Sequence, residues 1–260
     1  MLPIGVFTDF YHLPEAAALG FDFLEIPLDA LAALPEADFR EFADYAEGAG
    51  LNLAAASRML PPELPVTGPG VSATALHAYL QQALGRASRL GIRLVVMDAP
   101  ASRAVPDGVD FPYAWRQLGN FLRICQGHAK ARGITVALEP IRKQDCNLLN
   151  LVSEATLIAG LLQLENLAAA AHSGHMAMAS EPLSDLRRAA PLLKHVHLEN
   201  ALTRRLPKPG DGEDYARFLR QLDLIGYEGG VCLTGGWEGD FRVAAAEALA
   251  HIRASAAEKP

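Results

Sequence analysis

Side chains that can exchange protons or bind metals recur in this chain directly after short apolar runs. They are Glu25, Asp98, Glu139, His172, His197 with Glu199, and Thr234. Carboxylates and imidazoles serve as general acids and bases, and they are also the usual oxygen and nitrogen ligands of divalent metals. One such residue alone is typical of a solvated loop, but the repetition predicts a single polar site built from several strand ends.

The elements that would position these residues follow a repeated pattern: an amphipathic helix, a glycine, and a short apolar strand. The pattern occupies residues 18–26, 48–56, 89–97, 131–139 and 224–233. Its glycines stand where a helix end favours left-handed backbone, at Gly20, Gly50, Gly91, Gly133 and Gly226. Further strands are expected at Ile4–Phe7, Leu167–Ala171 and Leu193–Leu198, which brings the number of expected strands to eight.

Helices are expected between these strands. Their starts are predicted at Pro35 with Glu36, at Ser72 and at Ser153 with Glu154, and a long helix at about Tyr113–Ala131. Regular alternation of strands and helices indicates parallel pairing with right-handed crossovers. The first strand leads into VFTDFYH, which is not a glycine-rich phosphate turn and so disfavours a doubly wound sheet. We therefore predict one α/β domain over residues 1–260, a (β/α)8 TIM barrel with its site at the C-terminal strand ends.

The composition narrows the classes of partner. Half of the 260 residues are hydrophobic and 20% are charged, so the chain can bury a large core. The net charge of −7 argues against a nucleic-acid partner, which would require a basic surface. Cys125, Cys146 and Cys232 form no CxxC pair, and the longest apolar run, Ala155–Leu164, is too short for a membrane span. With no signal peptide recognised, we expect a cytoplasmic protein without membrane or nucleic-acid partners; whether it forms a homo-oligomer stays open.

Several segments together resemble the xylose isomerase-like TIM barrel family, also described as sugar phosphate isomerase/epimerase-like. ITVALEPIRKQDCNLLN resembles its fifth-strand motif, in which the glutamate of LEP binds a divalent metal. HSGHM is similar to the family's Asp-x-x-His-Met segment, and HVHLEN followed by Arg204, Arg205 and PGDG resembles the seventh-strand histidine and its Arg…Pro-Gly-x-Gly loop. GYEGGVCLT is similar to an eighth strand that usually ends in glutamate. The similarity runs in order from about Gly20 to Gly236.

The resemblance implies a metal site with two departures from the family pattern. The ligand positions hold Glu139, His172, His197 and Thr234, where the family usually has Glu, Asp, His and Glu. In one interpretation, the first three residues bind a divalent transition metal (zinc, manganese, iron or cobalt), because such a set suits these ions better than magnesium. In the other, the site has decayed, the metal is absent, and the histidines are polar pocket residues.

The resemblance also implies roles for other residues. Glu139 would take a proton next to a carbonyl that the metal polarises, and His175 would contact substrate oxygens. Glu25 resembles a substrate-facing glutamate of the second strand; the alternative is a solvated strand end. Arg204 or Arg205 would clamp a small anionic or polyhydroxylated substrate, unless the loop is merely a solvated basic segment.

These observations predict an isomerase-like enzyme that transfers a proton through an enediolate, or a related lyase. Thr234 removes one of the two carboxylates that the family uses as acid and base, and inversion of a carbon centre generally needs both, so an epimerase is less favoured. The alternative function is a non-catalytic, small-molecule (sugar) binding protein on a degenerate isomerase barrel. An endonuclease of the same superfamily would need more metal ligands and a basic crescent, which this acidic chain lacks.

Overall fold

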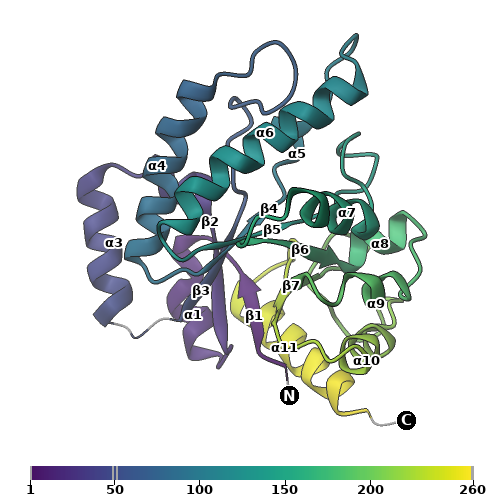
Figure 1. Ribbon diagram of the computed structural model, residues 1–260. Helices are drawn as coiled ribbons and strands as arrows, with labels where there is room; N and C mark the ends of the chain where they lie inside the picture. Colours follow the sequence, from purple (N-terminus) through teal and green to yellow (C-terminus); the bar gives the residue numbers. More distant parts are fainter. Residues whose placement is uncertain (1, 49, 51, 259–260) are drawn as a thin grey trace.

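Parallel strands close into a barrel in sequence order in the computed structural model, which describes residues 2–48, 50 and 52–258 (Figure 1). The strands are β1 (Ile4–Phe7), β2 (Phe23–Pro27), β3 (Leu53–Ser57), β4 (Leu94–Met97), β5 (Thr135–Leu138), β6 (Leu167–His172), β7 (Leu193–Leu198) and β8 (Gly230–Leu233). Pairing of β1 with β8, through Ile4 with Val231 and Val6 with Leu233, completes the closure. The predicted (β/α)8 fold is confirmed.

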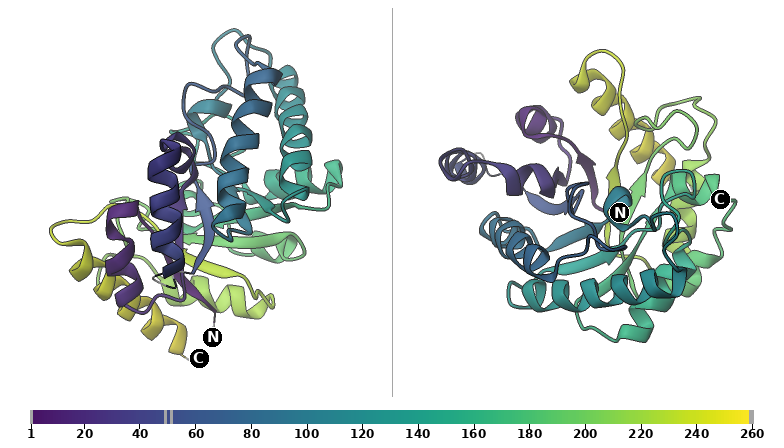
Figure 2. Two further views of the ribbon diagram at one scale, coloured as in Figure 1. Left: turned by 90° about the vertical axis from the view of Figure 1, so that its left-hand side faces the viewer. Right: turned by 90° about the horizontal axis from the view of Figure 1, so that it is seen from above.

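Helices surround the strands on the outside of the barrel (Figure 2). They are a 3-10 turn (Phe10–His12), α1 (Leu13–Ala18), α2 (Leu28–Ala33), α3 (Glu36–Gly48), α4 (Ala73–Arg89), α5 (Pro100–Arg103), α6 (Phe111–Lys130), α7 (Val152–Leu162), α8 (Ser173–Met178), α9 (Asp185–Ala189), α10 (Tyr215–Leu224) and α11 (Phe241–Ala257). Across the described ranges, no helix has both the length and the hydropathy needed to cross a membrane.

The glycines of the repeated pattern occupy the backbone conformation expected of them. Their φ angles are +81° at Gly20, +62° at Gly50, +79° at Gly91, +64° at Gly133 and +67° at Gly226. Each therefore reverses the chain between a helix and the strand that follows it. Ala49 and Leu51, which belong to the second repeat of this pattern, lie outside the described residues.

The helix starts agree with the sequence at Pro35 with Glu36, since α3 begins at Glu36, and at Ser72, and they differ at two others. Ser72 accepts a hydrogen bond from the backbone N–H of Ala75, as an N-cap should. The long helix α6 begins at Phe111 rather than Tyr113, because Asp110 supplies the cap. Helix α7 begins at Val152, and its start is capped not by Ser153 but by the carboxylate of Glu154, which accepts from the N–H of Asn150 and Leu151.

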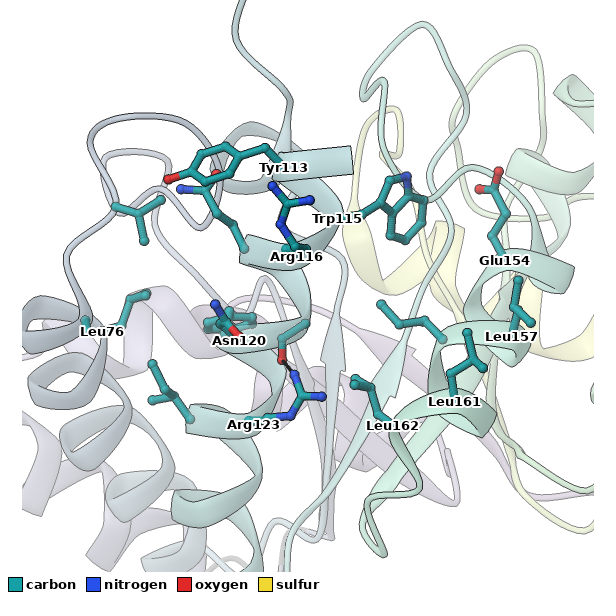
Figure 3. Close-up of a pocket in the computed structure, with 17 residues that line it drawn as sticks. Leu76, Tyr113, Trp115, Arg116, Asn120, Arg123, Glu154, Leu157, Leu161 and Leu162 are labelled. Carbon is teal, nitrogen blue, oxygen red and sulfur yellow. Dashed lines mark hydrogen bonds between the residues drawn. The ribbon is translucent and has the colours of Figure 1, made fainter. Parts of the chain in front are cut away.

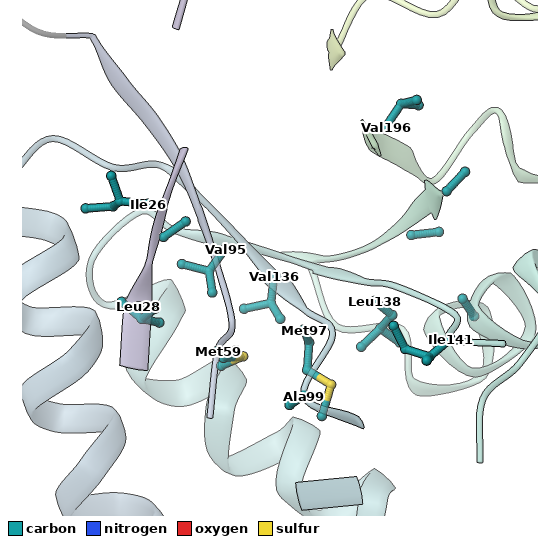
Figure 4. Packing of buried hydrophobic residues seen from close by; sticks show 14 of the residues in the cluster. Ile26, Leu28, Met59, Val95, Met97, Ala99, Val136, Leu138, Ile141 and Val196 are labelled. Carbon is teal, nitrogen blue, oxygen red and sulfur yellow. The ribbon is translucent and has the colours of Figure 1, made fainter. Parts of the chain in front are cut away.

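The strands alternate between the barrel interior and the helices. Outward residues such as Val95, Val136 and Val196 join the large core between strands and helices (Figure 4). Inward residues include the small Ala137, Ala168 and Ala170, which form a separate buried cluster with Val96 inside the barrel. The same inward positions of other strands carry glutamate and histidine, so the interior changes from apolar to polar toward β2, β7 and β8.

Candidate active site

A cavity of about 390 Å³ opens at the C-terminal ends of the strands, the end at which barrels carry their active sites. It is lined by Phe7, Thr8, Asp9, Pro27, Ser57, Arg58, Asp98, Pro100, Glu139, Ile141, Asp145, His172, His175, His197, Glu199, Arg204, Thr234, Gly235 and Trp237. The residues that the sequence predicted for the site and that lie on this wall are Asp98, Glu139, His172, His175, His197, Glu199, Arg204 and Thr234. Glu25 and Arg205 lie elsewhere.

Glu139 is held at the cavity by its backbone. It follows β5 directly, and its carbonyl oxygen accepts a hydrogen bond of 2.8 Å from Nη2 of Arg103. The guanidinium of Arg103 is fully buried and also donates to the carbonyl oxygens of Met97 and Leu149. One buried cation thus ties the ends of β4 and β5 to the following loop, and it fixes the direction in which the Glu139 side chain leaves the barrel.

His197 lies between two carboxylates. Its Nδ1 is 2.5 Å from Oε2 of Glu139, and its Nε2 is 2.9 Å from Oε1 of Glu25. Burial alone would lower the pKa of His197, but the two carboxylates outweigh burial and raise it well above its ordinary value. In this geometry both ring nitrogens carry protons, and the imidazolium donates one hydrogen bond to each glutamate.

Glu25 lies inside the barrel, below the cavity. Strand β2 continues past it to Pro27, so its side chain is fully buried and reaches His195 at 2.7 Å as well as His197. Burial would raise the pKa of Glu25, but the neighbouring imidazoles hold it well below its usual range. Because Glu25 contacts His197 and not the cavity, the substrate contact expected for it from the sequence remains a prediction without support from this geometry.

The donor atoms of Glu25, His195, His197 and Cys232 also lie within 4.8 Å of one another, a spacing that could suit a metal. However, the contacts of Glu25 with the two imidazoles, 2.7 and 2.9 Å, have the length of hydrogen bonds. Ligands around a tetrahedral zinc ion stand about 3.3 Å apart, given bonds of about 2.0 Å. We therefore interpret this group as a hydrogen-bonded network rather than as a metal site.

A second group faces the cavity itself. Donor atoms of Glu139, His172 and His175 lie within 4.8 Å of one another, and all three residues are buried. Burial above all, followed by neighbouring cationic groups, lowers the pKa of His172 well below its ordinary value and that of His175 to about 3. Both rings are therefore neutral at physiological pH and keep a nitrogen lone pair, as metal ligands must. This group fits a divalent transition metal, and His175 belongs to it although the sequence predicted only a substrate contact there.

Glu199 is a carboxylate that the sequence placed in the polar site without a specific role. It follows β7 directly, and its Oε2 is 3.9 Å from Nε2 of His172 and 3.9 Å from Nε of Arg204. Its backbone N–H donates a hydrogen bond to Oγ of Ser173, the first residue of α8. This contact fixes the position of Glu199 beside that helix. Burial raises the pKa of Glu199, so this carboxyl exchanges protons closer to neutrality than a surface glutamate does.

The two arginines of the β7–α10 loop differ in direction. Arg204 lies on the cavity wall, where its Nη1 is 3.0 Å from Oδ2 of Asp145. Asp145 is also paired with Arg142. Arg205 turns away and pairs with Glu238 at 2.6 Å. Arg204 alone of the two therefore reaches the cavity.

The sequence profile of the xylose isomerase-like TIM barrel family matches residues 13–255. The chain belongs to this family. No sequence among the curated proteins matches it.

Solved structures of the family's fold superpose on nearly the whole chain. 3-Keto-D-glucoside 4-epimerase from E. coli has 19% identity and a TM-score of 0.82, over 98% of this chain and 100% of its own. D-psicose 3-epimerase from Clostridium cellulolyticum, in a structure with D-tagatose, has 19% identity and a TM-score of 0.84, over 98% and 99%. An AP endonuclease of family 2 from Brucella melitensis has 19% identity and a TM-score of 0.77, over 94% and 96%. At these identities the likeness establishes the fold and not the reaction.

Within this xylose isomerase-like barrel, the eighth-strand departure is visible in the geometry. Thr234 lies on the cavity wall and its Oγ1 is 3.5 Å from Nε2 of His172, so a neutral hydroxyl stands beside the ring. Sequence reasoning overlooked Arg103 and His195. The spacing of His195 and His197, two positions apart on one strand, was a signal that both point into the barrel.

Proposed function

We propose that this protein is a sugar or keto-acid isomerase-like enzyme that transfers a proton at a carbon next to a carbonyl group. The observation that carries the proposal is the buried carboxylate of Glu139, 3% exposed, on the cavity wall beside two neutral imidazoles. The cavity of about 390 Å³ has the size of a monosaccharide site, near the lower end of the range of about 300–1,000 Å³ for ligand pockets. Structural neighbours that are named as epimerases of keto sugars support this substrate class.

Glu139, His172 and His175 would hold a divalent transition metal, and we keep His197 in the proposed ligand set because its Nδ1 lies beside Glu139. Such an ion would act as a Lewis acid on the substrate carbonyl and lower the energy of the adjacent carbanion. The nitrogen-rich set favours a divalent transition metal (zinc, manganese, iron or cobalt) over magnesium. To bind an ion, Nδ1 of His197 would have to lose its proton.

Glu139 is the proposed base. Its Oε2 lies beside Nδ1 of His197, and its Oε1 would take the proton from the substrate carbon. Arg204 at the rim provides a cation for an anionic or hydroxylated end of the substrate, but this requires it to exchange its contact with Asp145. His175 lies where it could also contact a substrate oxygen.

Glu199 favours a second candidate, an epimerase. Inversion of a carbon centre needs one group to remove a proton and another to return it on the opposite face. Thr234 cannot provide the second carboxylate, but Glu199 lines the same cavity and lies 3.9 Å from His172. Its raised pKa suits a group that donates a proton. The non-catalytic sugar-binding protein remains the alternative from a different class.

Solvent-isotope exchange separates these functions. Ketoses incubated with the metal-loaded protein in D₂O should gain deuterium at the carbon next to the carbonyl, and Glu139→Gln should abolish this gain. The stereochemistry of the product separates the two enzymes, because exchange should persist in Glu199→Gln for both. An epimerase should lose inversion in that variant, whereas an isomerase should form its product as before. A protein that binds a ketose without any exchange would be a binding protein, and undiminished exchange in Glu139→Gln would reject Glu139 as the base.

A further inference from the structure

The outer ring of helices is open between α6 and α7. Helix α6 packs mainly against α4, and α7 packs mainly against β6 and α9. A groove of about 1030 Å³ runs between α6 and α7 on the outside of the barrel (Figure 3). None of its lining residues lines the mouth cavity. The groove is also larger than most pockets for small ligands, which span about 300–1,000 Å³.

One wall of the groove is a helix without a polar outer face. Helix α7, VSEATLIAGLL, carries one charged residue, Glu154, at its start. Leu157 and Leu161 lie one turn apart on it and are 62% and 73% exposed. Tyr113 of α6 adds a third exposed apolar side chain on the other wall. Helices of this composition are normally covered on all sides, so this face indicates a protein partner.

The charged residues of the groove are divided between its two walls, with the arginines on α6 and Glu154 on α7. Arg116 and Arg123 come from α6, and within the described residues neither forms an ion pair. Figure 3 shows Glu154 at one end of the groove and Arg123 near the other. The carboxylate of Glu154 is held at its end because it caps α7.

We propose that a second copy of this chain occupies the groove, related by a two-fold axis. The exposed Leu157 and Leu161 line the groove, so two identical faces can pack their apolar surfaces against each other around the axis. With the two α7 helices antiparallel, Glu154 of each copy faces the partner's Arg123, and both pairs form at once. This self-complementarity of shape and charge favours a second copy over an unrelated protein, and it does not depend on the proposed function.

Sedimentation of the full chain over a range of concentrations tests the interface. The expected species has twice the 27.8 kDa mass of one chain. Leu161→Asp places a charge on this apolar surface and should yield a folded monomer. Leu224→Asp, at a residue that is 76% exposed at the end of α10, is the matched control and should leave the dimer intact. A wild-type monomer at every concentration, or a dimer that persists unchanged in Leu161→Asp, would overturn the proposal.

Charge reversal tests the predicted pairing. Arg123→Glu and Glu154→Lys should each weaken self-association at least about tenfold, because each change creates like-charge contacts twice across the axis. Mixed together, the two folded variants should form a heterodimer in which both opposite-charge pairs are restored. Circular dichroism should verify that Glu154→Lys, which loses a helix cap, remains folded. Failure of the mixture to associate more tightly than either variant alone would reject the antiparallel arrangement.

Discussion

Glu25 and His197 are separated by 172 residues in the chain, yet Oε1 of Glu25 lies 2.9 Å from Nε2 of His197. The contact reaches from β2 to β7 inside the barrel. It directs Nε2 of the imidazole into the interior and Nδ1 toward Glu139 and the cavity. A carboxylate that holds one ring nitrogen while the other faces a metal site is a common way to fix a histidine ligand. Glu25 is therefore a positioning residue for the site, supported from behind by His195.

Glu25→Gln should lower the affinity for a divalent metal by about 10- to 100-fold, because it removes the charge that orients His197. Isothermal titration of the metal-free variant with zinc or manganese measures this loss. Glu181→Gln is a matched control, since Glu181 is also a buried carboxyl and contacts the backbone N–H of Val152 rather than the site. Equal metal affinity in Glu25→Gln and wild type would contradict the positioning role.

The metal-free protein should lose stability in acid through His175. Its pKa is about 3 in the folded chain and about 6.5 in an unfolded chain, so below about pH 6.5 the unfolded state binds the additional proton. The contribution of His175 is present above that pH and is lost as the pH falls toward 3, by on the order of 1 kcal/mol per pH unit. Glu181, whose pKa is raised to about 7, acts in the opposite direction.

The difference between wild type and His175→Asn in the pH dependence of the free energy of unfolding therefore isolates the contribution of His175. Urea unfolding with a chelator at pH 7, 6 and 5 measures the free energy of unfolding, and it should fall more steeply with acid in wild type than in the variant. Parallel curves for the two proteins would show that His175 is not held neutral in the folded chain.

Arg204→Ala should weaken the binding of an anionic or polyhydroxylated ligand, whereas Arg205→Ala should leave it nearly unchanged. Arg204 lies on the cavity wall, and Arg205 is paired with Glu238 away from it. A lost charge-assisted hydrogen bond is worth about 1.5–3 kcal/mol, so the expected loss of affinity is roughly 10- to 150-fold. Titration with a sugar phosphate and its dephosphorylated sugar checks this. A larger effect from Arg205→Ala would reverse the assignment.

Arg103→Met should destabilise the fold by about 3 kcal/mol or more. Methionine fills a similar space, but the buried carbonyl oxygens of Met97, Glu139 and Leu149 would lose their donor. Chemical denaturation measures the change, with Arg93→Met as an exposed control. A loss below about 1 kcal/mol would show that Arg103 does not hold the strand ends together.

The sequence predicted the barrel well because its signals are local. Each repeated glycine needs left-handed backbone and each strand is a short apolar run, so element order could be read without knowledge of contacts. The cavity residues Glu139, His172 and His197 were found for the same reason, since they stand at or near strand ends.

Other features of the site depend on details that the sequence does not mark. Glu25 was taken for a strand end, but β2 runs on to Pro27, which leaves the carboxylate inside the barrel. Arg103 ends the short helix α5 after β4, and nothing in its sequence neighbours reveals that its guanidinium is buried. The proximity of Glu199 to His172 arises only when β6 and β7 pair.

We propose that Glu139 and the neighbouring imidazoles form one metal centre at the mouth of the barrel. Elemental analysis of the purified protein, after loading with zinc or manganese and removal of free metal, tests it most directly. We predict close to one ion per chain in wild type and little in His172→Ala, with both proteins equally folded. A wild-type chain that retains no ion, or a His172→Ala chain that retains as much as wild type, would contradict the claim.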